Sequence, residues 1–339
     1  MNGDKKKINI YELAEETGYS TSTVSKALNN TGRIGKETRQ KILDRARELN
    51  YIPSYHAKAL SLKESWIIAV IYTDNLGVGL AHPHFSVILE NFKREVEKAG
   101  YEVTFVNRNM GKTPMTYLEF CHYRKVDGVF IVNFYSLSHQ LPELIESGIP
   151  IVTADEGNLE ITTIVSDDLQ GGRLASEYLF ELGHNKKVYH IAGPQYTVSA
   201  QKRLQGFTEV MNEKKVPECK VYNTENFGFE DGYNAALEII KDDDLPTAIF
   251  VAGDWMALGA IKAFHEHSIK VPEDVSIIGY DDMEFLKYSI PALTTVSQNK
   301  SQIGITSAQY LLDKIAGEDR ESTTIDVSIV ERDTCKRIN

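Results

Sequence analysis

The sequence has little cysteine and no long apolar run. Its three cysteines, Cys121, Cys219 and Cys335, are odd in number and far apart, so we expect free thiols rather than a disulfide framework or a cysteine-based metal site. No segment approaches the roughly 20 apolar residues of a membrane-spanning helix. Residues 1–7 carry three lysines with no apolar stretch behind them, so we expect no signal peptide and a cytoplasmic protein.

The sequence also lacks the short motifs that mark common enzymes. It has no Gly-x-Ser-x-Gly elbow, no P-loop and no His-Glu-x-x-His motif. Gly77 and Gly79 begin a Gly-x-Gly pattern, but His82 stands where a dinucleotide-binding loop needs its third glycine. His265 and His267 lie two apart on a predicted helix, so they point in different directions and cannot chelate one metal. We therefore expect no catalytic residues, no metal and no cofactor.

Basic residues are concentrated at one end of the chain. The formal net charge of the whole sequence is −11, which alone argues against a nucleic-acid partner. Residues 1–63, however, hold twelve Lys and Arg against seven Asp and Glu, a net charge of +5 that leaves −16 on the remainder. A basic head joined to an acidic body is the charge distribution of a DNA-binding domain fused to a second function.

Two short helices joined by a glycine turn are predicted within this head. Asn9 and Glu12 have the spacing of a capping box at the start of a helix over residues 9–17. Gly18 ends that helix because glycine accepts a left-handed conformation, and Ser20 caps a second helix that runs to about residue 28. This is the helix-turn-helix arrangement, whose second helix enters the major groove of DNA.

The exposed positions of the second helix are small and polar, which lets it approach base edges closely. We expect Thr21, Ser22 and Lys26 to contact bases or phosphates, since Lys26 can reach a guanine edge or a phosphate. A third helix over residues 36–49 completes the bundle, although any three amphipathic helices would give a similar pattern. The residues expected on the DNA side of the second helix are Ser20, Thr21, Ser22, Thr23, Ser25, Lys26 and Asn29.

Three blocks of the head carry a resemblance to a known family. They are YELAEETGYS from Tyr11, TVSKALN from Thr23, and the pair Thr38-Arg39 followed by LNYIP from Leu49. At these intervals the chain resembles the LacI/GalR family of bacterial transcriptional regulators, and the resemblance continues to near residue 334. Many relatives carry Arg where Lys26 stands, and Lys lacks the planar fork for bidentate reading of guanine. Gly35 replaces a frequent Ser before the third helix but still caps acceptably.

The resemblance implies that residues 54–65 form a hinge helix that folds only on operator DNA. In the family, two copies of this helix lie in the minor groove, where a leucine wedges into a central base step. Leu60 matches that leucine, and the other hinge residues expected to contact DNA are Ser54, Tyr55, His56 and Ala57. Unstacking costs a few kcal/mol, but the resulting bend lets both heads of a dimer engage. The alternative interpretation of this segment is a plain linker.

Strand and helix patterns alternate from about residue 66 onward. Continuous apolar runs occupy residues 67–72, 102–106, 128–132, 150–153, 163–165, 188–192, 248–252 and 275–280. Such runs, separated by helices, predict parallel sheets that are covered on both faces. We expect two doubly wound lobes, and the resemblance implies that they form a clamp of the periplasmic-binding-protein type.

The expected fold class is therefore α/β, with an N-terminal helix-turn-helix bundle and a two-lobed, doubly wound parallel-sheet effector domain. We expect the bundle in residues 1–53 and the hinge helix in residues 54–65. The first lobe is expected to combine residues 66–167 and 299–327, and the second lobe 168–298 and 328–339. The chain then crosses between the lobes near residues 167, 298 and 327.

Ligands of open α/β sheets bind beyond the carboxyl ends of the strands, which in a clamp is the cleft between the lobes. Asp155, Arg203 and Asp281 match family positions that bind polar groups of the effector, and charged groups suit vicinal hydroxyls. Phe227 matches an aromatic that stacks on a sugar or base face. The full set of expected effector contacts is Phe85, Asp155, Arg203, Phe227, Trp255, Asp281 and Gln298. The alternatives are that the aspartates cap helices and that the aromatics belong to the core.

The chemical class of the effector rests on two positions. Some sugar-binding relatives have Asn where this chain has Gly253. The purine-binding relative has Gly there, but it uses an Arg where this chain has Thr197. We favour a saccharide, with a purine or a phosphorylated carrier protein as alternatives.

The sequence as a whole therefore predicts an allosteric repressor of a carbohydrate-utilisation operon. We expect it to act as a symmetric homodimer on a palindromic operator and to have no contact with membranes. Binding of the effector would close the lobes and shift the two hinges, which biases an equilibrium between DNA-competent and incompetent states. The competing interpretations are a sugar-binding protein of the transport type and an enzyme of doubly wound fold.

Overall fold

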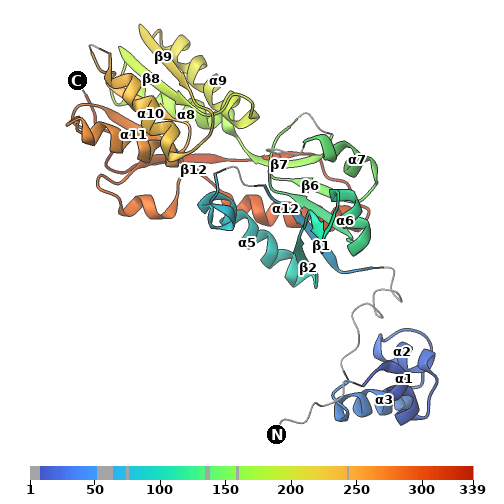
Figure 1. The fold of residues 1–339 in the computed structure, drawn as a ribbon. Helices are drawn as coiled ribbons and strands as arrows, with labels where there is room; N and C mark the ends of the chain where they lie inside the picture. The colour runs from blue at the N-terminus through green and yellow to red at the C-terminus, as the bar shows by residue number, and fades with distance from the viewer. Residues whose placement is uncertain are drawn as a thin grey trace. The chain divides into compact units, whose positions relative to one another are not determined.

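The computed structural model describes residues 8–51, 64–73, 76–133, 138–157, 160–242 and 244–338. The chain divides into two compact units, Met1–Trp66 and Ile67–Asn339, whose elements are labelled in Figure 1. None of the helices in the described ranges is both long enough and apolar enough to cross a membrane.

The first unit is a bundle of three helices: α1 (Ile10–Thr17), α2 (Thr21–Leu28) and α3 (Lys36–Glu48). Leu13, Val24 and Ile42, one from each helix, meet in its core and are fully buried. Each helix is too short to be stable alone, so the shared apolar core has to supply the stability.

The predicted start and end of the first helix and the predicted start of the second helix are confirmed. The side chain of Asn9 accepts from the backbone of Tyr11 and Glu12, and the Glu12 carboxylate accepts from the backbone N–H of Asn9 at 2.9 Å. Gly18 has φ 71° and ends α1 in the left-handed conformation. Ser20 caps α2 through the backbone N–H of Thr23. Gly35 precedes α3 without a side-chain cap.

The second unit contains two six-stranded sheets. In the first sheet the strand order is β13-β7-β6-β5-β1-β2 and every pairing is parallel. Its strands are β1 (Ile67–Ile71), β2 (Glu102–Phe105), β5 (Gly128–Ile131), β6 (Ile151–Thr153), β7 (Thr162–Ser166) and β13 (Thr323–Ile325). We call this sheet and its helices the first lobe.

The second sheet has the order β14-β12-β11-β10-β8-β9, and only β14 is antiparallel to its neighbour. Its strands are β8 (Lys187–Ala192), β9 (Glu218–Asn223), β10 (Ala248–Val251), β11 (Ser276–Asp281), β12 (Thr294–Gln298) and β14 (Val327–Val330). This sheet and its helices form the second lobe. The predicted pair of parallel-sheet lobes is thus confirmed.

Helices cover both faces of each sheet, as continuous apolar strands require. On the first sheet, Ile68 and Phe130 face α5 (Pro83–Lys98) and α12 (Lys300–Ile315), whereas Ala69 and Val129 face α6 (Tyr117–Arg124) and α7 (Leu141–Glu146). On the second sheet, α8 (Asp168–Glu181) and α9 (Val198–Glu213) cover one face, and α10 (Phe229–Ile240) and α11 (Asp254–Glu266) cover the other.

The remaining elements are short. They are the 3-10 helices η1 (Gly79–Ala81), η2 (Ser138–Gln140) and η3 (Glu284–Tyr288) and the hairpin of β3 (Asn109–Met110) with β4 (Thr113–Pro114).

The chain passes between the two sheets three times. It leaves the first sheet after β7 to form α8, leaves the second sheet after β12 to form α12, and leaves the first again between β13 and β14. The second and third passages lie side by side, because Gln298 at the end of β12 is the register partner of Val327 at the start of β14 (Figure 1). Both lobes are therefore built from segments distant in sequence.

Candidate nucleic-acid interface and ligand cavity

The polar face of α2 is the first candidate site. All seven of its predicted DNA-contacting residues are exposed or half-buried, while Val24 and Ala27 on the opposite face are buried. The amphipathic helix is thus held to the bundle by its apolar face and presents its hydroxyl, amide and ammonium groups outward.

Four of these seven residues already use their side chains in hydrogen bonds within the bundle. The hydroxyls of Ser20 and Thr23 lie 2.9 Å apart in the helix cap, and Asn29 donates to the Ser25 hydroxyl at 3.4 Å. Within residues 8–51, the side chains of Thr21, Ser22 and Lys26 make no such hydrogen bond. These three side chains are therefore available for an external partner.

The Lys26 side chain lies along the loop that follows α2. Its Cδ atom would be 3.1 Å from a Cβ placed on Gly32, so the aliphatic stem rests on a glycine that has no side chain to displace it. Gly32 has φ +68°, a conformation that glycine adopts easily. The hinge residues Ser54, Tyr55, His56, Ala57 and Leu60 lie outside the described residues.

The second candidate site is a cavity of about 1040 Å³, including its open mouth, in the second unit. All seven residues predicted to contact an effector lie in its lining: Phe85, Asp155, Arg203, Phe227, Trp255, Asp281 and Gln298. They come from both lobes and mostly follow the carboxyl ends of parallel strands.

Arg203 on α9 is buried and already partly bonded. Its Nε donates to Asp168 Oδ1 at 2.8 Å, and its Nη1 donates to the carbonyl of Ala252 at 2.6 Å. The guanidinium carbon lies 3.7 Å from the ring centroid of Tyr280 and 5.7 Å from that of Phe227. Arg203 therefore holds a fixed position in which Asp168 compensates its charge.

Asp281, at the end of β11, connects the lobes at the cavity. The amide of Gln298 donates to its carboxylate at 2.5 Å, and the hydroxyl of Ser166 on β7 donates to the same Gln298 side chain at 2.6 Å. Lys300, at the start of α12, donates to the backbone carbonyl of Asp281. Burial raises the pKa of the Asp281 carboxyl, while the positive charges of Arg203 and Lys300 oppose that rise.

Asp155 lies beside a second link between the lobes. Its carboxylate accepts from the backbone N–H of Glu156 at 2.9 Å, and its own N–H donates to Thr153 at 3.0 Å. Glu156, which also lines the cavity, forms a two-oxygen ion pair with Lys202 on α9 at 2.6 and 2.8 Å. A molecule that touches Asp155 and Asp281 would therefore contact both lobes next to existing bridges.

Aromatic side chains form much of the apolar wall. Phe227 fills the space beside Gly193, where an added Cβ would approach its ring to 2.2 Å. Phe85 lies in the first turn of α5. Trp255 lies in the first turn of α11, and its indole N–H is buried without a hydrogen-bond partner among the described residues. Flat apolar faces with a few polar groups between them suit a small ring-shaped ligand.

Among the lining residues to which the sequence did not point are His84, Glu156 and Asp168. For His84 a signal existed: Pro83 marks the first position of a helix, and α5 begins at that residue. His84 Nδ1 lies 3.7 Å from Asp281 Oδ1. Burial and the charge of Lys300 hold the pKa of His84 well below its usual value, so this contact joins a neutral imidazole to Asp281 and is no ion pair.

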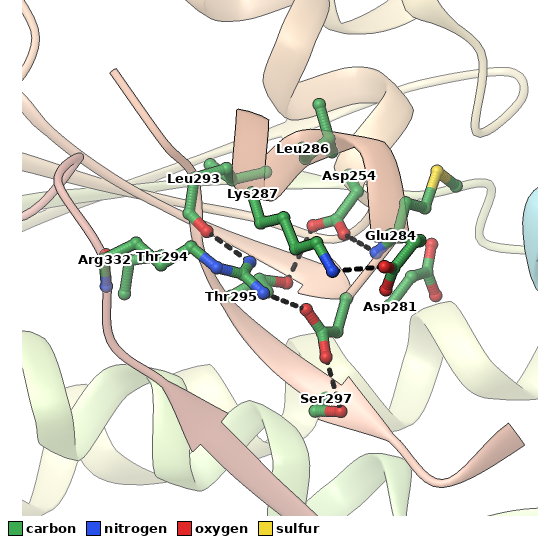
Figure 2. Close-up of polar contacts among 12 residues, drawn as sticks. Asp254, Asp281, Glu284, Leu286, Lys287, Leu293, Thr294, Thr295, Ser297 and Arg332 are labelled. Atoms are coloured by element: carbon green, nitrogen blue, oxygen red, sulfur yellow. Dashed lines mark hydrogen bonds and ion pairs between the residues drawn. The ribbon is translucent and has the colours of Figure 1, made fainter. Parts of the chain in front are cut away.

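A polar network lies behind Asp281 in the second lobe (Figure 2). The buried carboxylate of Asp254 accepts from the backbone N–H of Met283 at 2.8 Å and from the hydroxyl of Thr295 at 2.7 Å. Asp282 accepts from Ser297 at 3.0 Å and from Arg332 at 2.5 Å. Burial and the nearby Asp281 carboxylate raise the pKa of Asp254, while its two hydrogen-bond donors favour the ionised form.

Carboxylates are the main charged groups of the cavity lining. Four of them line it, those of Asp155, Glu156, Asp168 and Asp281, and three cations lie against these residues: Arg203 pairs with Asp168, Lys202 pairs with Glu156, and Lys300 donates to the backbone carbonyl of Asp281. The described parts of the chain contain no group of three or more His, Cys, Asp or Glu side chains placed to hold a metal ion. The lining carboxylates can accept hydrogen bonds from a neutral, hydroxyl-bearing molecule.

Comparisons with known proteins cover both units. The sequence-family model for bacterial regulatory proteins of the lacI family matches residues 9–54, and the sequence-family model for the periplasmic binding protein-like domain matches residues 176–335. The chain is 32% identical over 337 residues to the HTH-type transcriptional repressor PurR of Mannheimia succiniciproducens, with 97% of this chain and 99% of the relative aligned.

Two solved structures are also similar. A crystal structure of the lac repressor dimer bound to operator and the anti-inducer ONPF has a TM-score of 0.82 at 29% identity, with 98% of this chain and 100% of that chain covered. A LacI family transcriptional regulator from Enterococcus faecium with bound ribose has a TM-score of 0.69 at 26% identity, with 80% of this chain and 100% of that chain covered.

Proposed function

The chain belongs to the LacI family of bacterial regulatory proteins and is a DNA-binding transcriptional regulator; from this premise we propose that it is a repressor controlled by a small saccharide bound in the cavity. The observation that carries the proposal is the convergence of residues from both lobes on one cavity, with Asp155 on the first lobe and Asp281 on the second. A ligand held by both carboxylates changes the lobe spacing that the DNA-binding units sense.

A saccharide fits the chemistry of the cavity lining. Carboxylates accept hydrogen bonds from vicinal hydroxyls, and Phe227 offers a flat apolar face. Arg203 is already compensated by Asp168 and Lys202 by Glu156, which works against a sugar phosphate as ligand. The similar regulator from Enterococcus faecium holds ribose. We therefore propose a neutral sugar as effector and a carbohydrate-utilisation operon as target.

A nucleobase is the second candidate ligand. An added Cβ at Gly253 would lie 3.4 Å from the Phe227 ring and 3.8 Å from an Asp281 carboxylate oxygen, so the absence of a side chain there leaves these two lining residues accessible to a planar base that stacks on Phe227. The Thr197 hydroxyl, however, accepts from the backbone N–H of Ala200 and caps α9, and threonine supplies no positive charge to a base. The same ligand screen separates the two candidates.

We further propose a function for each segment of the chain. Residues 1–53 read the major groove and residues 54–65 form the hinge, with Leu60 as the minor-groove wedge. Residues 66–167 with 299–327 and residues 168–298 with 328–339 make the two effector lobes. The similar lac repressor structure is a dimer on operator, which supports a symmetric dimer on a palindromic site here.

The test combines a ligand screen with a binding assay. Thermal-shift measurements on neutral sugars, sugar phosphates and nucleobases identify ligands, and gel shifts on the DNA upstream of the gene follow with each of them. We expect a neutral sugar to stabilise the protein and to change the shift, and Asp281→Asn to abolish that change while leaving operator binding intact. If no gel shift occurs with any ligand, the proposal that the protein is a repressor is refuted. If only nucleobases stabilise the protein, the proposal that the effector is a sugar is refuted.

A further inference from the structure

The turn that carries Asp281 has an unusual backbone. Asp281 has φ 122° and Asp282 has φ 55°, so two successive non-glycine residues lie in a region that L side chains rarely adopt. Such conformations carry a cost and persist only where the surrounding structure holds them. The direction of the Asp281 side chain therefore depends on whatever fixes this turn.

Besides Lys300 on α12, whose ammonium donates to the backbone carbonyls of Asp281 and Asp282, two groups of contacts within the second lobe hold the turn in place. The first is Asp254, which is fully buried and binds the backbone N–H of Met283, the residue directly after the turn. The second is the side chain of Asp282, which is pinned by Ser297 on β12 and by Arg332. Figure 2 shows both groups on one side of Asp281.

Arg332 makes three contacts that together fix its position. Its Nη2 donates to Asp282 at 2.5 Å, its Nη1 donates to the carbonyl of Leu293 at 2.8 Å, and its backbone N–H donates to the Thr294 hydroxyl at 2.9 Å. The side chain is 15% exposed. Burial raises the pKa of Asp282, but hydrogen bonds from Arg332 and Ser297 outweigh it and leave that pKa below its usual value. A planar guanidinium can bridge two acceptors in this way, whereas an ammonium cannot do so with the same geometry.

Arg332 does not line the cavity, although Asp281 does. Only Glu331 separates it from β14, which begins just beyond the third passage between the lobes. The Arg332–Asp282 pair thus joins the last crossing segment to the turn that carries Asp281.

We propose that Arg332 is a positioning residue for the effector cavity, which acts through Asp282 to hold the left-handed turn that directs Asp281 into the cavity. Its functional consequence rests on the proposed role of Asp281 in effector binding. The structural part of the inference stands apart from that role, because it concerns only what fixes residues 281–283.

Hydrogen–deuterium exchange on the full-length protein tests the inference without any ligand. We expect Arg332→Met to speed exchange at least tenfold in peptides covering residues 281–286 and to leave strands β8 and β10 within twofold of wild type. Arg332→Lys should recover part of the protection, because it keeps the charge beside Asp282 but loses the bridge to Leu293. Arg173→Met is the matched control, since Arg173 binds Glu209, Glu213 and Glu177 in the same lobe away from the cavity.

Asp282→Asn provides a second variant of nearly unchanged size in case Arg332→Met does not fold. The two substitutions combined should speed exchange of residues 281–286 by less than the product of their separate effects, since both break the Arg332–Asp282 contact. Unchanged exchange in this segment, or an equal increase across the whole lobe, would overturn the inference. A local increase together with an unaltered effector response in Asp281→Asn would support the role of Arg332 and reject the proposed role of Asp281.

Discussion

At the scale of single residues, a buried histidine makes the second lobe sensitive to acid. His190 on β8 is fully buried between the rings of Phe207 and Phe250, whose centroids lie 5.0 and 4.4 Å away. One ring nitrogen contacts the Phe250 carbonyl at 2.9 Å, and burial lowers the pKa of His190 to about 4. The unfolded chain takes up this proton near pH 6.5, so the stability from neutral His190 is complete above pH 6.5 and is lost as pH falls toward 4.

We predict that His190→Leu removes part of this acid sensitivity. Between pH 7.5 and pH 5, wild type should lose about 2 kcal/mol more unfolding free energy than the variant, as measured by urea unfolding at both pH values. The comparison concerns the change with pH, so any overall loss from the substitution cancels. His265→Leu, at an exposed position of α11, is the control. Equal pH dependence in wild type and His190→Leu would contradict the prediction.

A second residue-scale prediction concerns the α2 face. If Lys26 reads a base, Lys26→Ala should weaken binding to the cognate operator by about 1–3 kcal/mol and relax specificity at one position. If it touches only phosphate, the loss should be uniform across sequences and the salt slope should fall by about one. Fluorescence anisotropy on operator and altered half-sites at several salt concentrations separates the two. Lys41→Ala, on α3 beside Glu37, is the control and should bind as wild type.

At the scale of helices and strands, close helix packing depends on glycines that face a neighbouring backbone. A Cβ added to Gly232 on α10 would lie 1.9 Å from the Met256 carbonyl oxygen on α11, and one added to Gly259 on α11 would lie 2.0 Å from that of Phe229. The two helices thus approach each other through reciprocal glycines. Because the opposing atoms are backbone, they cannot move aside as a side chain would.

We predict that Gly232→Ala destabilises the protein by about 3 kcal/mol, the upper part of the usual range for overpacking. Alanine favours a helix over glycine by about 1 kcal/mol, but the clash with Met256 outweighs that gain. Chemical denaturation measures the difference. Asn234→Ala, at an exposed site on the same helix, should be neutral or slightly stabilising, and a neutral result for Gly232→Ala would show that α10 and α11 can separate at little cost.

Elements with strong local signals could be predicted from the sequence, and the others could not. The capping box at Asn9 and the apolar runs of β1, β5, β8, β10 and β11 are local, and the structure confirms them. Strand β9 was not predicted, because it lies at a sheet edge with mostly exposed side chains. Strand β12 was recognised only as a crossing, since its sequence TTVSQ is largely polar.

In the cavity, too, features with a local sequence signal could be predicted and the others could not. The strand-end residues Asp155 and Asp281 could be named because parallel strands place their carboxyl ends together. The Arg203–Asp168 and Glu156–Lys202 pairs join segments more than 30 residues apart, and no local pattern reveals such pairs. The resemblance supplied positions that line the cavity, and the structure supplied the partners that hold them.

At the scale of the whole molecule, an exposed apolar segment of the second lobe suggests where two copies meet. Phe285, Tyr288 and Ile290 lie in and just after η3, and Ile290 is 99% exposed. A cluster of large apolar side chains on a surface typically marks an interaction site. We therefore place part of the proposed dimer interface on this segment.

We predict that Ile290→Asp shifts the protein toward monomer and weakens operator binding at least tenfold, because one head then binds without its partner. Analytical ultracentrifugation and gel shifts measure the two effects. Val221→Asp, at another exposed apolar position in the same lobe, is the control and should stay dimeric. If the Ile290→Asp variant remains dimeric, the dimer interface lies on another surface.

The three passages between the lobes have a consequence for how the protein is made. The first sheet is covered by α12 and completed by β13, so the ribosome has to release nearly the entire chain before the core around β1 can close. The three-helix head needs only residues up to about 51. At about 5–20 residues per second, a nascent chain exposes a finished head tens of seconds before its lobes can fold. During synthesis the reading unit therefore exists without its regulator, and regulation begins only with the last residues translated.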